Sequence, residues 1–166
     1  MLTLSEKVMY GTTGVCSVER IEEKRIGRTV GKYYVLKPVS QSTSTVYVPY
    51  DNEKLLSKVR KVITPDEIKE LFRSLSEEPD IWFENDAERR MKYNDIISSG
   101  GCKQYLLLIR TLYNRQVMLS NCGKRLHISD ERALKEARRL ISDEFSYALG
   151  TTREQAEKLV EQEFKK

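Results

Sequence analysis

Few residues in this chain could carry out nucleophilic or metal chemistry. There is one histidine, His127, and there are three cysteines, Cys16, Cys102 and Cys122. A nucleophile–base pair would need His127 beside a thiol or a serine hydroxyl, with a third group to orient the imidazole, and the sequence indicates no such group. A tetrahedral zinc site would need ligands from both halves of the chain, and the glycines form no phosphate-binding or dinucleotide-binding motif. We therefore predict a protein that is not an enzyme and that has no metal and no cofactor.

Basic residues are the second group that could do chemistry, and their distribution along the chain is uneven. The net charge is +4, but residues 63–88 carry −7 and residues 89–139 carry +8. A basic block between acidic ones is typical either of a phosphate-facing surface or of solvated helix faces. Within this block, Arg89, Arg90 and Lys92 form a short basic run that follows the only tryptophan, Trp82.

Composition sets the cellular context that we expect. No apolar run approaches the roughly 18–20 residues that span a bilayer. The N-terminal residues lack the pattern of a signal peptide, and three widely spaced cysteines are typical of reduced thiols. We expect a cytoplasmic protein, without a membrane partner, that exists as a monomer.

Short strands and glycine turns dominate residues 1–62. Residues 43–48 alternate, with Val46 and Val48 on one face and Thr45 and Tyr47 on the other. Pro49 ends this run because proline donates no ladder hydrogen bond. With further extended runs at residues 8–10, 15–21 and 32–36, the pattern predicts a small SH3/Tudor-like β-barrel.

The pattern changes to helices at Thr64, and we place the domain boundary just before it. Residues 64–67 combine an N-cap hydroxyl, a proline at the first helical position and a capping-box glutamate. Apolar periodicity predicts helices over about 64–75, 86–98 and from 103, and two more that are capped by Ser129 and by Thr151 with Glu154, with Gly150 between them. The predicted fold class is α+β, with a β-domain over 1–62 and a compact helical domain over 63–166.

The N-terminal arrangement resembles the polymerase-interacting domain shared by CarD, CdnL and transcription-repair coupling factors. The matching stretches are residues 7–11, 14–15, 18–22, 33–37 and 46–49, with Asn52. The resemblance implies a sheet edge that pairs with the RNA polymerase β subunit by strand addition. The polymerase-binding residues that it implies are Lys24, Arg25, Thr45, Val46, Tyr47 and Pro49.

The resemblance continues through the helical half. Residues 77–79 followed by Trp82 resemble the segment before that family's DNA-contacting tryptophan, and residues 89–92 resemble its basic run, although residues 83–88 intervene here. The resemblance implies that Trp82 enters the minor groove at the upstream edge of the melted bubble, where a flat side chain stacks on partly unstacked bases. The DNA-binding residues that it implies are Trp82, Arg89, Arg90, Lys92, Lys124, Arg125, Arg132 and Arg138.

The expected function is that of a bacterial transcription regulator. It would bind RNA polymerase and promoter DNA without sequence specificity, stabilise the open promoter complex, and associate with the nucleoid through the polymerase. Three alternatives stay open: an SH3-like RNA- or peptide-binding module acting in translation, a relative that binds polymerase without a DNA wedge, and an enzyme that uses Cys102 or Cys122 with His127.

Overall fold

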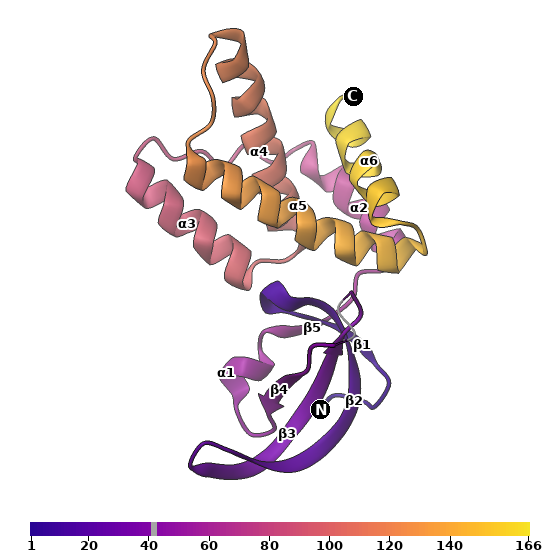
Figure 1. Ribbon diagram of the computed structural model, residues 1–166. Helices are drawn as coiled ribbons and strands as arrows, with labels where there is room; N and C mark the ends of the chain where they lie inside the picture. The colour runs from indigo at the N-terminus through magenta and orange to yellow at the C-terminus, as the bar shows by residue number, and fades with distance from the viewer. Residues whose placement is uncertain (41–42) are drawn as a thin grey trace. The chain divides into compact units, whose positions relative to one another are not determined.

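The computed structural model describes residues 1–40 and 43–166 and divides the chain into two compact units (Figure 1). The first unit is Met1–Val62 and the second is Ile63–Lys166. The first unit holds the strands and the second holds the long helices, so the predicted α+β class, with a sheet followed by a helical domain, is confirmed.

The first unit is built on a five-stranded antiparallel sheet. Its strands are β1 (Lys7–Tyr10), β2 (Gly14–Ile26), β3 (Thr29–Pro38), β4 (Val46–Pro49) and β5 (Val59–Lys61). Their order across the sheet is β4-β3-β2-β1-β5, which makes β4 and β5 the two edges. A 3₁₀ turn (Gly11–Thr13) joins β1 to β2, and the short helix α1 (Glu53–Leu56) precedes β5.

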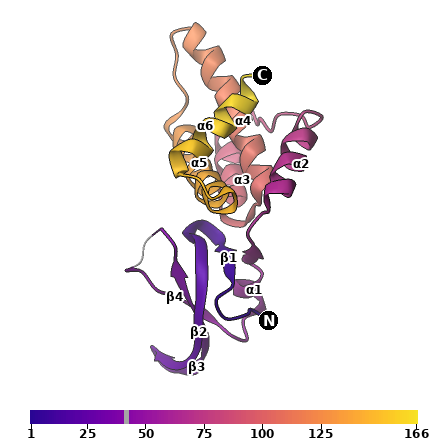
Figure 2. The same cartoon turned by 90° about the vertical axis from the view of Figure 1, so that its right-hand side faces the viewer.

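The β2–β3 hairpin is the longest element of the sheet. Its pairs run from Cys16 with Pro38 to Ile26 with Thr29, and a bulge lies between Val18 and Arg20. The shorter β1 and β4 pair only with the ends of β2 and β3 away from the hairpin turn, so the distal part extends as a two-stranded ribbon with mostly exposed side chains (Figure 2). The small core of this unit consists of Val8, Cys16, Val18, Tyr34, Leu36 and Val48.

The second unit consists of five helices. They are α2 (Pro65–Leu75), α3 (Asp86–Ser99), α4 (Cys102–Asn121), α5 (Ile128–Leu149) and α6 (Arg153–Phe164). Helix α5 packs against each of the other four, so its apolar residues form the centre of the core, as Figure 1 shows for α3, α4 and α6. Among the residues that the structure describes, no helix combines the length and apolar character needed to cross a bilayer.

Three N-caps were predicted for the helices, and two of them lie one or two residues away from the observed N-cap. The capping box at Thr64 is present, as predicted, with both of its hydrogen bonds to Glu67. The N-cap of α5 is His127 rather than Ser129, because the extended backbone of His127 lets its imidazole accept the Ser129 N–H at 3.2 Å. The capping box of α6 uses Thr152 with Gln155 instead of Thr151 with Glu154.

Candidate functional site

The loop of residues 76–85, which connects α2 to α3 and carries Trp82, is held in place by side chains of α4. The Ile81 N–H donates to the Thr111 hydroxyl at 3.0 Å. Arg110 donates to the Asp80 carboxylate at 2.8 Å, to the Glu78 carbonyl in the loop and to the carbonyl of Leu75 at the end of α2. Asn114 donates to the same Asp80 carboxylate at 3.0 Å. Residues at these spacings share one face of a helix, so a single face of α4 fixes the loop.

Helix α3 fixes the same loop from a second direction. The buried Tyr93 hydroxyl donates to the Ile81 carbonyl at 2.9 Å, and its ring packs edge-on against Phe83 with centroids 6.2 Å apart. Burial raises the pKa of Tyr93, which keeps the phenol protonated as a donor. Because both neighbours of Trp82 in sequence are anchored, the indole stands on a well-ordered backbone.

Arg89 lies in the interior of the helical unit. Its side chain is only 4% exposed, and its guanidinium contacts both carboxylate oxygens of Asp130 in α5 at 2.9–3.1 Å. It also donates to the Phe83 carbonyl at 2.8 Å and to Asp86 at 2.7 Å. Hydrogen bonding to Asp130 raises the pKa of this guanidinium. In the structure, the Arg89 guanidinium is therefore not exposed for the phosphate contact that the resemblance implied, because it is buried and hydrogen-bonded within the helical unit.

Trp82 itself is half-buried between two arginines. The guanidinium carbon of Arg89 lies 4.2 Å from the centroid of the indole ring, and that of Arg115 lies 4.1 Å from it. Trp82 also packs against the apolar core of the unit. Its N–H is buried and has no hydrogen-bond partner among the residues that the structure describes. Such an unsatisfied buried donor is uncommon in native proteins.

The other predicted DNA-binding cations lie on different parts of the helical unit. Arg90 and Lys92 are exposed on α3. Arg132 lies about 200° around α5 from Asp130, which puts it on the opposite side of that helix from α3. It lines a hollow of about 890 Å³ with Arg138.

That hollow is of mixed charge rather than uniformly basic. Its charged lining residues are Glu131, Arg132, Lys135, Glu136, Arg138, Arg139, Arg153 and Glu157. Hydrogen bonds from Arg139 lower the pKa of Glu136, so that carboxylate stays ionised. The three carboxylates partly offset the five cations across the hollow, which weakens it as a site for phosphate.

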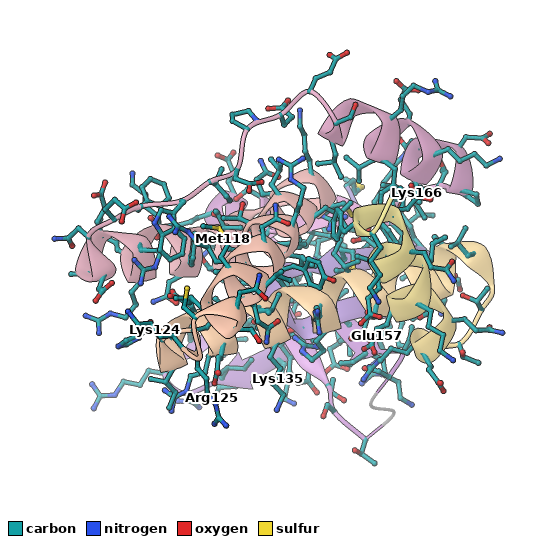
Figure 3. The ribbon with its side chains drawn as sticks, turned by 90° about the horizontal axis from the view of Figure 1, so that it is seen from above. Met118, Lys124, Arg125, Lys135, Glu157 and Lys166 are labelled. Carbon is teal, nitrogen blue, oxygen red and sulfur yellow. The ribbon has the colours of Figure 1, made fainter. Side chains whose placement is uncertain are left out.

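The loop after α4 carries two of the predicted DNA-binding cations. Lys124 and Arg125 are both exposed, and Figure 3 shows them close together beyond the end of α4, well away from Glu157. Lys135, a residue of α5, lies between Arg125 and Glu157 in the same view. The predicted DNA-binding residues thus separate into an α3 group, a loop group and the hollow.

In the sheet unit, β4 is an edge strand that pairs with β3 alone. Val46, Tyr47 and Pro49 are half-buried members of β4, and Thr45 is exposed just before it. The Lys24 ammonium lies 3.9 Å from the centroid of the Tyr47 ring, and Tyr33 meets that ring edge-on. The structure therefore brings Lys24 and Tyr47 together, while Arg25 is exposed one residue farther along the ribbon.

Two of the three thiols and the histidine make contacts within their own units, whereas Cys122 is exposed in the loop after α4. Cys16 is buried in the sheet core, where burial raises its pKa to about 11, far from that of a nucleophilic thiol. Cys102 donates to the buried Glu144 carboxylate at 3.1 Å. His127 caps α5 and also contacts the Ser129 hydroxyl at 2.8 Å. The described residues contain no cluster of three or more potential metal ligands.

Sequence reasoning missed the residues that position Trp82. These are Tyr93, Arg115, Thr111 and Asp130. Asp130 is the acidic residue in the first turn of α5, and helix-dipole arguments fully explain an acid there. Neither spacing nor composition pairs it with Arg89, 41 positions earlier.

Comparison with protein-family models matches both units. Residues 2–63 match the CarD-like/TRCF RID domain, and residues 70–161 match the CarD C-terminal domain. Comparison with curated protein sequences gives no match. Since the two matches follow one another in order and together span most of the chain, this protein belongs to the CarD family, a non-enzymatic family of transcription regulators that interact with RNA polymerase.

Proposed function

We propose that this protein stabilises the open promoter complex, with the sheet unit bound to the RNA polymerase β subunit and Trp82 placed against DNA at the upstream edge of the bubble. Membership of the CarD family supports the polymerase interaction. The DNA contact is supported chiefly by one observation: Trp82 is half-buried in a 76–85 loop whose backbone is fixed by hydrogen bonds on both sides of it.

This mounting suits a binding residue better than a core residue. A tryptophan that serves only packing usually finds a partner for its N–H, whereas the N–H of Trp82 has none among the described residues. The backbone on either side is fixed by Thr111 and Arg89. A rigid, partly exposed aromatic side chain loses little conformational entropy when it contacts a ligand.

The electrostatic part of the DNA contact falls to the exposed cations. Arg90, Lys92, Lys124 and Arg125 all have exposed side chains that phosphates can reach. Such contacts are independent of base sequence and weaken with salt. Arg89 is left out of this set, and Arg132 and Arg138 are secondary candidates because of the carboxylates around them.

The energetic requirement is a difference in affinity between melted and closed DNA. A ligand that binds both states equally shifts nothing, and a preference of about 1.4 kcal/mol shifts the equilibrium tenfold. An aromatic ring can stack on an unpaired base but not on one that is fully stacked in a duplex. Attachment to the polymerase raises the local concentration of such a weak DNA binder.

The sheet edge supplies the attachment. Strand β4 presents main-chain groups on the side away from β3, where a strand of the polymerase can add to the sheet. The cluster of Lys24 and Tyr47 lies beside this edge and offers a cationic and aromatic side-chain contact.

A promoter-opening assay with Trp82→Ala tests the DNA contact. We expect this variant to bind polymerase like the wild type and to lose stabilisation of the open complex. The matched control is Tyr147→Ala, which removes a 41% exposed aromatic side chain from another part of the same unit. Equal promoter opening by wild type and Trp82→Ala would favour a regulator that binds polymerase without a wedge.

Capture by the isolated β-subunit lobe tests the attachment. We expect Tyr47→Ala and Lys24→Ala to weaken capture, and Lys37→Ala, an exposed lysine on β3, to leave it unchanged. Retention by ribosomes or RNA in place of polymerase would support the alternative of a translation module.

A further inference from the structure

The two arginines that contact Trp82 must cover opposite faces of its ring. Each guanidinium carbon lies about 4 Å from the same centroid, at 4.2 Å for Arg89 and 4.1 Å for Arg115. Two planar cations of this size cannot lie side by side over one face at that distance without overlapping, and their charges repel. In the free protein, neither face of the indole is therefore open to a stacking base.

The two covers differ in how firmly they are held. The side chain of Arg89 is 4% exposed and bonded to Asp130, Asp86 and the Phe83 carbonyl. The side chain of Arg115 is 30% exposed, and its ion pair is a single 3.4 Å contact with Glu84, whose side chain is 88% exposed. Exposed pairs of this kind contribute little to stability, so Arg115 is the cover that can move.

We propose that Arg115 is a displaceable cover on Trp82, held in place by Glu84 in the free protein, and that it becomes a phosphate contact when a melted strand stacks on the indole. This inference rests on the proposed function, because it assigns the face of Trp82 that meets DNA. It adds a DNA-contacting residue, Arg115, and an inhibitory residue, Glu84.

The exchange follows from sterics and charge. A base that stacks on an aromatic ring occupies the space in which the Arg115 guanidinium now lies. The displaced cation remains next to the incoming strand, where a phosphate accepts its hydrogen bonds in the same geometry as a carboxylate. Glu84 opposes DNA twice, since it retains Arg115 on the ring and presents a negative charge beside the approaching phosphates.

The first test uses the fact that Trp82 is the only tryptophan, so all indole emission comes from the proposed site. Acrylamide should quench Arg115→Ala more strongly than the wild type without any DNA. The charge-matched control is Arg73→Ala, which removes an exposed arginine from α2. Circular dichroism checks that both variants are folded. Equal quenching of wild type and Arg115→Ala would overturn the inference, because the ring would then be no less accessible with its arginine present.

The second test measures affinity for DNA containing a premelted bubble. Loss of an exposed ion pair predicts that Glu84→Gln binds about two- to fivefold more tightly than the wild type. The control is Glu88→Gln, which removes the same charge four residues later, at a side chain for which the described structure shows no ion pair. An equal gain in both variants would mean that general repulsion, not release of Arg115, is responsible, and the inference would fail.

The salt dependence of bubble binding tests the bound position of Arg115. Arg115→Ala should reduce the slope of log affinity against log salt by about one unit. An unchanged slope would overturn the phosphate contact.

Failure of the proposed function has a separate signature. Trp82→Ala would then bind the bubble like the wild type even though Arg115→Ala raises quenching. That result refutes both proposals, whereas unchanged quenching with a defective Trp82→Ala refutes the cover alone.

Discussion

Removal of the Asp130 carboxylate tests whether the buried Arg89–Asp130 ion pair stabilises the part of the helical unit that holds Trp82. Arg89 and Asp130 are 4% and 2% exposed, and three N···O distances of 2.9–3.1 Å join them. In Asp130→Ala, the Arg89 guanidinium stays buried and loses its main partner. Only Asp86, which is largely exposed, and the Phe83 carbonyl remain.

The expected loss of stability is large. Removing one partner of a buried, hydrogen-bonded ion pair costs about 3–5 kcal/mol, because an uncompensated charge remains in the interior. A domain of this size has a free energy of unfolding of roughly 5–15 kcal/mol, so the variant should lose about a fifth of it or more. Urea unfolding followed by circular dichroism at 222 nm measures this loss in the helical unit.

A control separates the ion pair from the helix dipole. Glu131→Ala removes the neighbouring exposed acid from the same first turn of α5 and should cost at most about 1 kcal/mol. The double variant Arg89→Met/Asp130→Leu should recover most of the stability, since apolar residues of similar volume can replace a buried pair. A loss below about 1 kcal/mol for Asp130→Ala would refute the reasoning, because the pair would then not be desolvated.

Three further predictions concern other parts of the molecule. Burial raises the pKa of Cys16 to about 11 from 9.0, so the folded state favours the neutral thiol. The free energy of unfolding of the sheet unit should therefore be constant below pH 9 and fall as pH rises toward 11. Cys16→Ala should reduce this dependence on pH in denaturant titrations. Gly100→Ala should destabilise the helical unit far more than Gly101→Ala in thermal unfolding, because a Cβ at position 100 would clash with the Ile96 carbonyl oxygen. Thr111→Val should cost about 1–3 kcal/mol in urea unfolding, since it leaves the Ile81 N–H without its partner, and should lower the preference for bubble DNA.

Local sequence signals predicted the elements well because each signal acts within a few residues. The capping box at Thr64 involves only Glu67, three residues away. Apolar periodicity predicted α5 because its stripe faces one contiguous core. Sequence periodicity did not predict β5 or α1, because these elements are only three and four residues long and no period can be recognised over that length.

The candidate site was harder to predict because its geometry depends on contacts between distant residues. A run of basic residues such as 89–92 reads the same whether its members face solvent or the core. The structure buries Arg89 and exposes Arg90, a difference decided by the presence of Asp130 on another helix. Similarly, Arg115 had no sequence signal beyond its charge, although it contacts Trp82, 33 positions earlier.

The use of Arg89 inside the protein is consistent with a DNA binder that is tethered. A free DNA-binding protein gains affinity from every phosphate contact, whereas a tethered one needs only a difference in affinity between melted and paired DNA. Holding Trp82 rigidly increases that difference in affinity, whereas one more phosphate contact does not.

Attachment to polymerase and preference for melted DNA should therefore respond differently to the concentration of the protein. Raising the concentration of Tyr47→Ala should restore open-complex stabilisation, because mass action replaces the weakened tether. The same increase with Trp82→Ala should restore nothing, because that variant has lost the preference itself. Rescue of both variants alike in a promoter-opening titration would show that the sheet edge and the indole contribute only additive affinity.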